Sequence, residues 1–195
     1  MTSSESRLIE LAQQIGAVGM QAAKAYNEAQ ANLKLEQVLT PERLSTDTGT
    51  GESLATLDAL SALNSSHKKM FQKFVTAAVA QLTTVLAEVP EERATALRDG
   101  MIRSLNWNLD AQAMFYARRE EWIVVATSIC QLIESRRHSI AFTRDGLEFE
   151  SDDDLGQFSR LVAQADEIHQ LEVAQTAERL ARLAKSMAIL SPKSA

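Results

Sequence analysis

The side chains with the best spacing for metal binding are Asp166, His169 and Glu172, which lie three residues apart. On a helix they would share one face, and helical bundles build metal centres from such carboxylate and imidazole ligands on several facing helices. The other two histidines lack this pattern, because His67 has no acidic residue three or four positions away and His138 has only one, beside two arginines. The ligands would therefore come from one helix alone, and we predict no metal site.

The acidic run at residues 148–154 raises the question of a calcium loop. A loop of the EF-hand type needs a glycine at its sixth position and a glutamate at its twelfth. Counted from Glu150, these positions hold Leu155 and Leu161. The three aspartates at 152–154 fit a helix N-terminus better, because the exposed N–H groups and the helix dipole favour acidic side chains there.

Nucleophilic catalysis would require a cysteine or serine activated by a neighbouring base. The single cysteine, Cys130, lies within the apolar window 122–133, which indicates a small core residue rather than a reactive thiolate. The sequence also contains no glycine-rich phosphate loop, no G-x-S-x-G and no H-E-x-x-H. We predict no catalytic residues and no cofactor, and a protein that is not an enzyme is the favoured reading.

Two histidines form the remaining candidate site. His67 and His169 each fall on the apolar stripe of a predicted helix, at about the same depth from its start. In an up-and-down bundle the second and fourth helices run parallel on the diagonal, so equal depth would bring both imidazoles into one core layer. The two histidines are therefore a possible pH-sensitive core pair, but we favour the alternative that each forms a local hydrogen bond or lies at the edge of its stripe.

Composition favours long helices as the elements that position these residues. The 195 residues are 45% apolar, with only 7 glycines, 3 prolines and 5% aromatic residues. This length and apolar content predict a single domain over residues 1–195. The net charge of -6, without a dense basic segment, argues against a nucleic-acid partner.

Apolar residues repeat every three or four positions in four segments, a spacing also found in coiled coils. We predict helices over 5–39, from Ser53 to 89, from 90 to about 137, and after Ser151. Asp99-Gly100 and Asn106-Trp107-Asn108 are candidate breaks in the third helix, whose continuity stays open. The segment 40–52, rich in Thr, Gly and Pro, is predicted to be a mobile linker, and residues 191–195 a frayed tail. Gly16, Gly19, Ala12 and Ala23 form a strip of small residues on the first helix.

One segment departs from the helical pattern, because residues 139–150 alternate apolar and polar side chains around Asp145-Gly146. A two-residue turn there predicts a β-hairpin with Phe142 opposite Phe149 and Arg144 opposite Leu147. The fold class is therefore all-α: an elongated up-and-down four-helix bundle with one β-hairpin inserted between helices 3 and 4.

The apolar face of this hairpin is the predicted partner-binding site. An isolated two-stranded hairpin is marginally stable in water, so this face must be covered. Its own bundle could cover it, or a protein partner or second copy could do so. We favour the partner. The four residues on this face are Ile140, Phe142, Leu147 and Phe149.

Location and function follow from these features. The apolar window 122–133 is too short for a membrane span, and the N-terminus shows no export signal. A single cysteine suits a reducing compartment, so we predict a cytoplasmic protein, with export without a cleaved signal as the alternative. We expect a non-enzymatic bundle acting through protein contact, as an adaptor, chaperone-like protein or homodimeric scaffold. A ligand-sensing or enzymatic bundle with a pocket between helices is the alternative.

Overall fold

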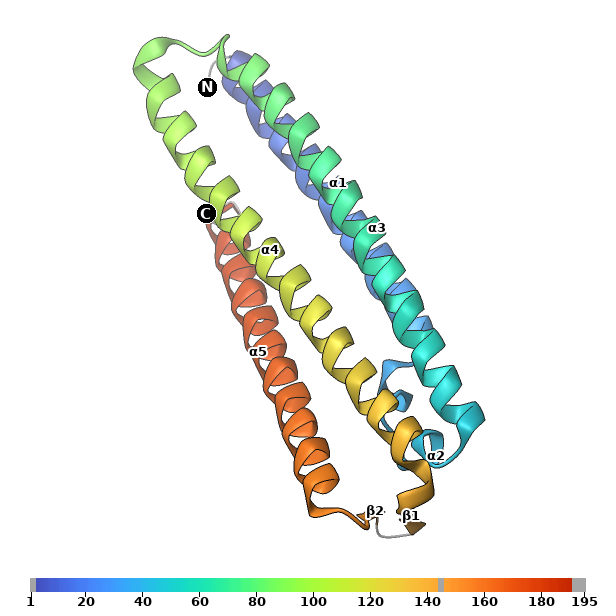
Figure 1. The fold of residues 1–195 in the computed structure, drawn as a ribbon. Coiled ribbons are helices and arrows are strands. Elements are labelled where there is room, and N and C mark those ends of the chain that lie inside the picture. The colour runs from blue at the N-terminus through green and yellow to red at the C-terminus, as the bar shows by residue number, and fades with distance from the viewer. Residues whose placement is uncertain (1–2, 144–145, 191–195) are drawn as a thin grey trace.

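A computed structural model describes residues 3–143 and 146–190. The predicted fold class is confirmed: long helices run up and down in an elongated bundle, and a β-hairpin lies between the third and fourth of them (Figure 1). The long helices are α1 (Ser3–Asn32), α3 (Asp47–Leu86), α4 (Glu91–Arg136) and α5 (Asp152–Leu190). The shorter elements are η1 (Leu35–Gln37), α2 (Pro41–Leu44), η2 (Arg137–Ser139), β1 (Ile140–Thr143) and β2 (Gly146–Phe149).

Each long helix packs against its neighbour in the chain, so α1 lies on α3, α3 on α4, and α4 on α5. Helices joined by short connections become antiparallel neighbours, as in other up-and-down bundles. We call the end that carries α2 and the strands the hairpin end, and the opposite end, where residues 87–90 join α3 to α4, the distal end (Figure 1).

The apolar core is concentrated at the hairpin end. The larger buried cluster there contains Val38, Leu44, Leu57, Val125, Ala126, Ile129, Cys130, Ile133, Ile140, Ala165 and Ile168. Among the residues whose side chains are described, the distal cluster has Leu8, Val85 and Leu86 as its buried members. Because buried apolar contact is the main source of stability, the hairpin half of the bundle is the better anchored one.

Helix α4 is continuous through both candidate breaks. Asp99-Gly100 and Asn106-Trp107-Asn108 lie within its 46 residues, and the Asn108 amide donates a hydrogen bond to the Ser104 carbonyl at 2.8 Å. A single glycine inside a helix costs about 1 kcal/mol relative to alanine, which neighbouring contacts can offset.

The prediction of a mobile linker over 40–52 is wrong, because this segment is folded into α2 and the start of α3. Thr40 caps α2, and Thr46 caps α3 by accepting a hydrogen bond from the Gly49 N–H at 3.0 Å. Helix α3 therefore starts at Asp47 rather than after Ser53. The threonines typical of a loop are N-caps here, a role for which their hydroxyls are well suited.

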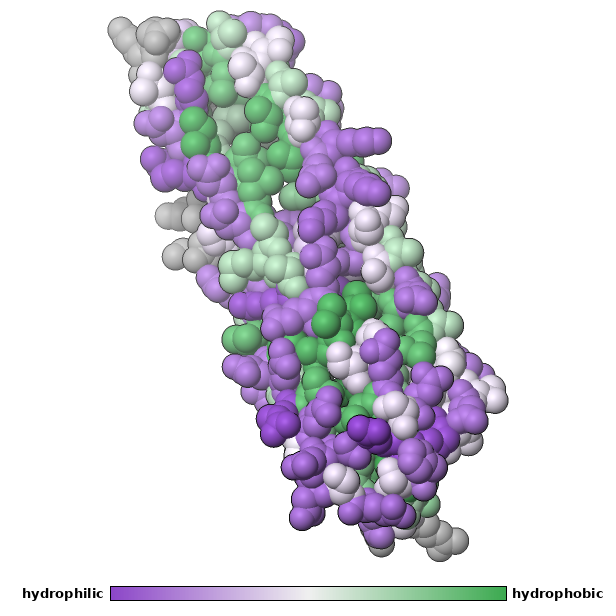
Figure 2. Space-filling model, viewed as in Figure 1, coloured by the Kyte–Doolittle hydropathy of each residue, from purple (hydrophilic) through white to green (hydrophobic). Residues whose placement is uncertain are grey.

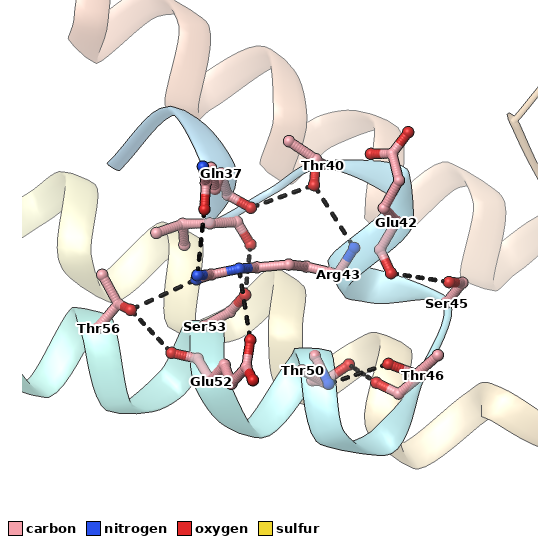
Figure 3. A network of polar contacts seen from close by, with 12 residues as sticks. Gln37, Thr40, Glu42, Arg43, Ser45, Thr46, Thr50, Glu52, Ser53 and Thr56 are labelled. Atoms are coloured by element: carbon pink, nitrogen blue, oxygen red, sulfur yellow. Dashed lines mark hydrogen bonds and ion pairs between the residues drawn. The ribbon is translucent and has the colours of Figure 1, made fainter. Parts of the chain in front are cut away.

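Buried hydroxyl groups hold this segment against the rest of the hairpin end (Figure 3). Thr50 and Ser53 are fully buried, and the Ser53 hydroxyl donates to the Val38 carbonyl at 2.7 Å. Arg137 reaches across from η2, where its guanidinium donates to the Leu44 carbonyl at 2.9 Å and to the Thr50 hydroxyl at 2.6 Å. Helix α2, the start of α3 and η2, which leads into the hairpin, are thus joined in one polar network.

The hairpin register differs from the prediction by two residues. Phe142 pairs with Leu147 and Ile140 with Phe149, so Phe142 does not lie opposite Phe149. Gly146, predicted to be a turn residue, instead begins β2, where it pairs with Thr143 and has a φ of 139°, which glycine adopts readily. The predicted partner Arg144 lies outside the described residues. A shift of two residues leaves the faces unchanged, so the apolar face has the predicted composition.

Helix ends follow the capping signals. Helix α1 ends at Asn32 instead of 39, because Lys34 takes a left-handed conformation with a φ of 52°. Helix α5 begins as predicted after Ser151, whose hydroxyl accepts a hydrogen bond from the Asp154 N–H at 3.3 Å.

Candidate functional site

A layer of polar and aromatic side chains crosses the middle of the bundle, between the two apolar clusters. All four long helices contribute to it. We call it the central polar layer: Tyr26 from α1, Asn64 and His67 from α3, Gln112, Phe115, Tyr116 and Arg119 from α4, and Glu172 from α5. Buried polar groups are costly unless they are paired, so this layer is the most unusual part of the interior.

An internal ion pair joins α4 to α5 in this layer. Arg119 Nη2 lies 3.1 Å from Glu172 Oε2, and the two side chains are 11% and 13% exposed. Burial raises the pKa of the Glu172 carboxyl, while the charges of Arg119, His169 and Arg118 act in the opposite direction. A buried ion pair adds little net stability over apolar packing, but losing one partner is costly, so the pair favours one alignment of α4 and α5.

A second set of contacts joins α1, α3 and α4 around His67. The Tyr116 hydroxyl lies 2.9 Å from His67 Nδ1, and the Tyr26 ring lies 4.5 Å from the imidazole centroid. Burial lowers the pKa of the His67 imidazole. Burial also raises the pKa of the Tyr26 hydroxyl, with opposing effects from Arg119 and Glu172. His67 is therefore held as a neutral imidazole between two tyrosines at neutral pH.

Four buried polar atoms of this layer make no hydrogen bond to other described groups. They are Tyr26 Oη, Asn64 Oδ1, Arg119 Nε and Glu172 Oε1. An unsatisfied buried polar group costs about 1–3 kcal/mol. The chemistry of the layer suits helix registration and a response to pH, since imidazole, phenol and carboxyl groups exchange protons.

The possible core pair of His67 and His169 does not form, as the favoured alternative expects. His169 lies on the exposed side of α5, whereas Ile168 and Glu172 face the bundle. His67 makes its contacts with α1 and α4, and α5 packs mainly on α4. The alternative of a local hydrogen bond applies to His67, which contacts Tyr116. His169 lies beside the core stripe of α5, because that stripe passes through Ile168.

Replacing His67 with glutamine is expected to reduce the loss of stability on acidification. The folded pKa is lowered below the ordinary value of 6.5, so the unfolded chain binds the proton more readily. His67 therefore contributes stability above pH 6.5 that is lost as the pH falls toward the folded pKa. Denaturant midpoints at about pH 7.5 and about pH 5 should differ less in His67→Gln than in the wild type.

His138→Gln is the matched control, because His138 is exposed. This variant should keep the wild-type pH dependence. The raised pKa of Glu172 has the opposite effect on the pH dependence of stability, because it stabilises the folded protein when this carboxyl is protonated. This contribution is common to the wild type and both variants. An identical pH dependence in His67→Gln and the wild type would contradict the prediction.

Cys130 is a core residue, as the sequence predicts. It is fully buried, and burial raises the pKa of its thiol to about 11. A protonated, inaccessible thiol reacts slowly with disulfide reagents. Ellman's reagent should therefore label the native protein far more slowly than the denatured protein, and fast native labelling would show that this part of the core opens readily.

The residues considered for metal binding do not form a site. Among residues 3–143 and 146–190 there is no group of three His, Cys, Asp or Glu side chains placed to hold a metal ion. Asp166 and His169 are exposed, while Glu172 is paired with Arg119. Asp154 pairs with Arg136 at 3.2 Å. No helix in this part of the chain is long and apolar enough to cross a membrane.

The apolar face of the hairpin packs against the protein's own bundle. Ile140 is buried, and the other three predicted binding residues, Phe142, Leu147 and Phe149, are half-buried against the larger core cluster. The Phe149 ring lies 5.2 Å from that of Phe158, and the Arg137 guanidinium lies 5.5 Å from the Phe142 ring. The protein's own bundle thus covers this face, which is one of the two possibilities considered from the sequence. Partner binding by these four residues stays a prediction.

Exposed apolar side chains are most frequent in the distal half. Figure 2 shows a hydrophobic band down the distal part of one face, bordered by hydrophilic side chains, and a further patch nearer the hairpin end. Two of the open grooves on the described surface lie between long helices. The first, between α1 and α3, is lined by Leu11, Gln14, Ile15, Val18, Phe74, Ala77, Ala78 and Gln81. The second, between α4 and α5, is lined by Trp107, Asp110, Ala111, Met114, Gln175 and Glu178.

Sequence reasoning did not identify the central polar layer. Tyr26 lies four residues after Ala22 on the stripe of α1, and Glu172 lies four residues after Ile168 on that of α5. Polar residues at positions where the stripe is otherwise apolar are the sequence signal from which this layer could have been predicted. Which of these polar residues contact one another depends on the relative heights of the four helices in the bundle. The spacing of residues within one helix gives no information on those heights.

Comparison with family models, with curated proteins and with solved structures finds no match for this chain. Its function must therefore be argued from its own residues. Two features carry that argument: the central polar layer inside the bundle, and the exposed apolar side chains outside it.

Proposed function

We propose that this protein is a non-enzymatic helical bundle that acts through contact with other protein chains. The observation that supports it is the exposure of large apolar side chains in the distal half, where the core is small. Contiguous exposed apolar surface on a folded protein is typical of interaction sites. These residues are Ile9, Val18, Met20, Met70, Val79, Ile102, Met114 and Val173.

The shape of the surface also favours contact over catalysis. Enzyme sites are typically concave pockets in which a few polar groups converge on a buried ligand. The groove between α1 and α3 is open, and its lining is mainly apolar, with Gln14 and Gln81 as its polar members. Such a surface fits an amphipathic helix, which places its apolar face in a groove of this kind.

The broader assignments belong to the same proposal. The protein would act as an adaptor, a chaperone-like protein or a homodimeric scaffold in the cytoplasm. A single buried cysteine suits a reducing compartment. The net charge of -6 favours protein partners over nucleic acid.

Photo-crosslinking tests the proposal. A photoreactive amino acid at Val18, which is 52% exposed in the distal half, should crosslink to another protein chain in cells that express the protein. Val124 is the matched control, because it is 64% exposed but lies in the hairpin half. Crosslinks from position 18 and not from 124 support the proposal. Crosslinks from neither position, or from 124 alone, contradict it.

A ligand-sensing or enzymatic bundle is the second candidate, favoured by the central polar layer and the neighbouring groove between α4 and α5. Gln175 lines that groove and also donates to the Ala111 carbonyl at 2.9 Å. A small ligand bound there would raise the melting temperature of the wild type. The same compound should have little effect on Trp107→Ala, which lacks the largest side chain of the groove.

A further inference from the structure

Charged residues are absent from one long stretch of α1 and from one of α3. Residues 11–23 contain no charged side chain, and neither do residues 74–87. The two stretches lie side by side, because Gly19 faces the Phe74 ring and the groove of the distal half runs between them. A helix on the outside of a bundle normally carries charged residues on its solvent face, so an uncharged outer face is typical of a covered surface.

The uncharged stretch of α1 has charges of opposite sign at its two ends. Glu10 and Lys24 flank it, and each lies seven residues from Ala17. Residues spaced by seven fall on nearly the same line of a helix, and all three are exposed here. The uncharged stretch that includes the end of α3 is flanked by Lys73 and Glu88, which are also of opposite sign.

The pattern is self-complementary under a two-fold rotation. An axis perpendicular to α1 at Ala17 reverses the direction of the second helix, so Glu10 of each copy meets Lys24 of the other. A two-fold interface forms every contact twice, and a patch must then complement itself. Gln14, three residues before Ala17, lies next to this line and also lines the groove of the distal half.

We propose that the partner on this face is a second copy of the chain, with the two α1 helices packed antiparallel about Ala17. This inference rests on the proposed function by protein contact and names the partner. Gly16 and Ala17 at the centre allow the two helices to approach closely, and nothing lies within 4 Å of a side chain added at Gly16 in one copy. Met20, three residues after Ala17 and 62% exposed, is then removed from water.

The existing ion pairs are compatible with this arrangement. Arg7 pairs with Glu88 at 2.5 Å, and Lys24 lies 3.7 Å from Glu28. The Lys24 and Glu28 side chains are 76% and 65% exposed, so Lys24 is free to turn toward a second copy. Pairs this exposed contribute little within one chain.

The size of the face suits a reversible dimer. From Arg7 to Glu28, α1 rises about 32 Å at 1.5 Å per residue, and one helix with its side chains is about 10 Å wide. About 300 Å² per copy lies in the range of weak, transient contacts. We therefore expect a dimer that dissociates on dilution.

Charge reversal tests the pairing. E10K and K24E should each raise the dimer dissociation constant at least about tenfold, because each reversal replaces two ion pairs with two like-charge contacts. The double variant E10K/K24E should restore dimerisation, as should an equal mixture of the two single variants, which pairs opposite charges at both positions. Sedimentation velocity at several concentrations compares these four samples with the wild type.

Disulfide trapping tests the axis without relying on charge. In A17C, two cysteines at the axis should form an intermolecular disulfide under mild oxidation, whereas A163C, on the exposed side of α5, should not. The native Cys130 is buried and does not compete.

The results distinguish this inference from the function on which it rests. A wild type that stays monomeric, a dimer unaffected by the charge reversals, or equal trapping of A17C and A163C would overturn the inference. Crosslinks from position 18 to a different protein would then keep the proposed function and replace the second copy with that partner. Absence of any crosslink would contradict the proposed function itself.

Discussion

Replacing Gly49 with alanine is expected to destabilise the protein by about 2 kcal/mol, as overpacking of a tight site does. A Cβ atom at this position would lie 2.8 Å from Arg43 Cα and even closer to the Arg43 carbonyl oxygen. The obstructing atoms are backbone, so α2 and the start of α3 would have to move apart. That movement would also strain the buried hydrogen bond between Ser53 and the Val38 carbonyl. Urea denaturation of both proteins measures the difference in the free energy of unfolding.

Gly51→Ala provides the matched control in the same helix. Nothing lies within 4 Å of a Cβ atom at Gly51. Alanine should be neutral there or stabilise the helix by up to about 1 kcal/mol, because it restricts the unfolded chain. Equal effects at the two glycines would contradict the close approach of α2 to α3.

The double variant Phe142→Ser/Phe149→Ser is expected to lower the stability by about 3 kcal/mol, since large apolar side chains are lost from a packed site. Both rings are half-buried against the larger core cluster, where Phe149 packs on Phe158. Serine would place hydroxyls against this apolar surface and remove the cover from the hairpin end. Thermal and urea denaturation should both show the loss.

The other face of the hairpin supplies the control for this pair. Ala141 and Glu148 are exposed and lie opposite each other in the ladder. Ala141→Ser/Glu148→Ser should change the stability by less than about 0.5 kcal/mol. If instead the phenylalanine variant keeps its stability but loses association with a partner, the hairpin would be the contact surface, as first predicted from the sequence.

The helices and the hairpin faces were predictable because both depend on local periodicity. Apolar residues spaced by three and four residues indicated four helices, and alternation around Asp145-Gly146 indicated a hairpin with its apolar face intact. A register shift of two residues left that face unchanged, so this error had no consequence for packing. The capping position of Ser151 was equally local.

The segment 40–52 was not predictable from the same signals. Threonine and glycine are typical of mobile loops, but here Thr46 is an N-cap, Thr50 is buried, and Gly49 permits a close backbone approach. Each of these roles depends on residues distant in sequence. Arg137, for example, bonds to Thr50 from the far end of α4.

The contacts of the candidate site were not predictable either, because they join residues that are distant in sequence. His67 was identified, but its partners Tyr26 and Tyr116 come from other helices. Placing His169 on the apolar stripe of α5 puts that stripe one residue too late in the sequence. The residue of α5 that faces the core at this height is Ile168. Contacts across the bundle depend on helix rotation and relative height, which periodicity within one helix defines only approximately.

Hydrogen exchange in dilute solution tests the central claim most directly, namely that the bundle is closed at its hairpin end and offers an open surface at its distal end. Amides of residues 122–133 and 53–64 should exchange slowly, since they surround the larger core cluster. Amides of residues 11–23 and 74–85 should exchange at least about a hundredfold faster, because few buried contacts hold them, and should become protected when the protein is concentrated. Equal and concentration-independent protection in both halves would contradict the account, because the distal half would then be complete without a partner.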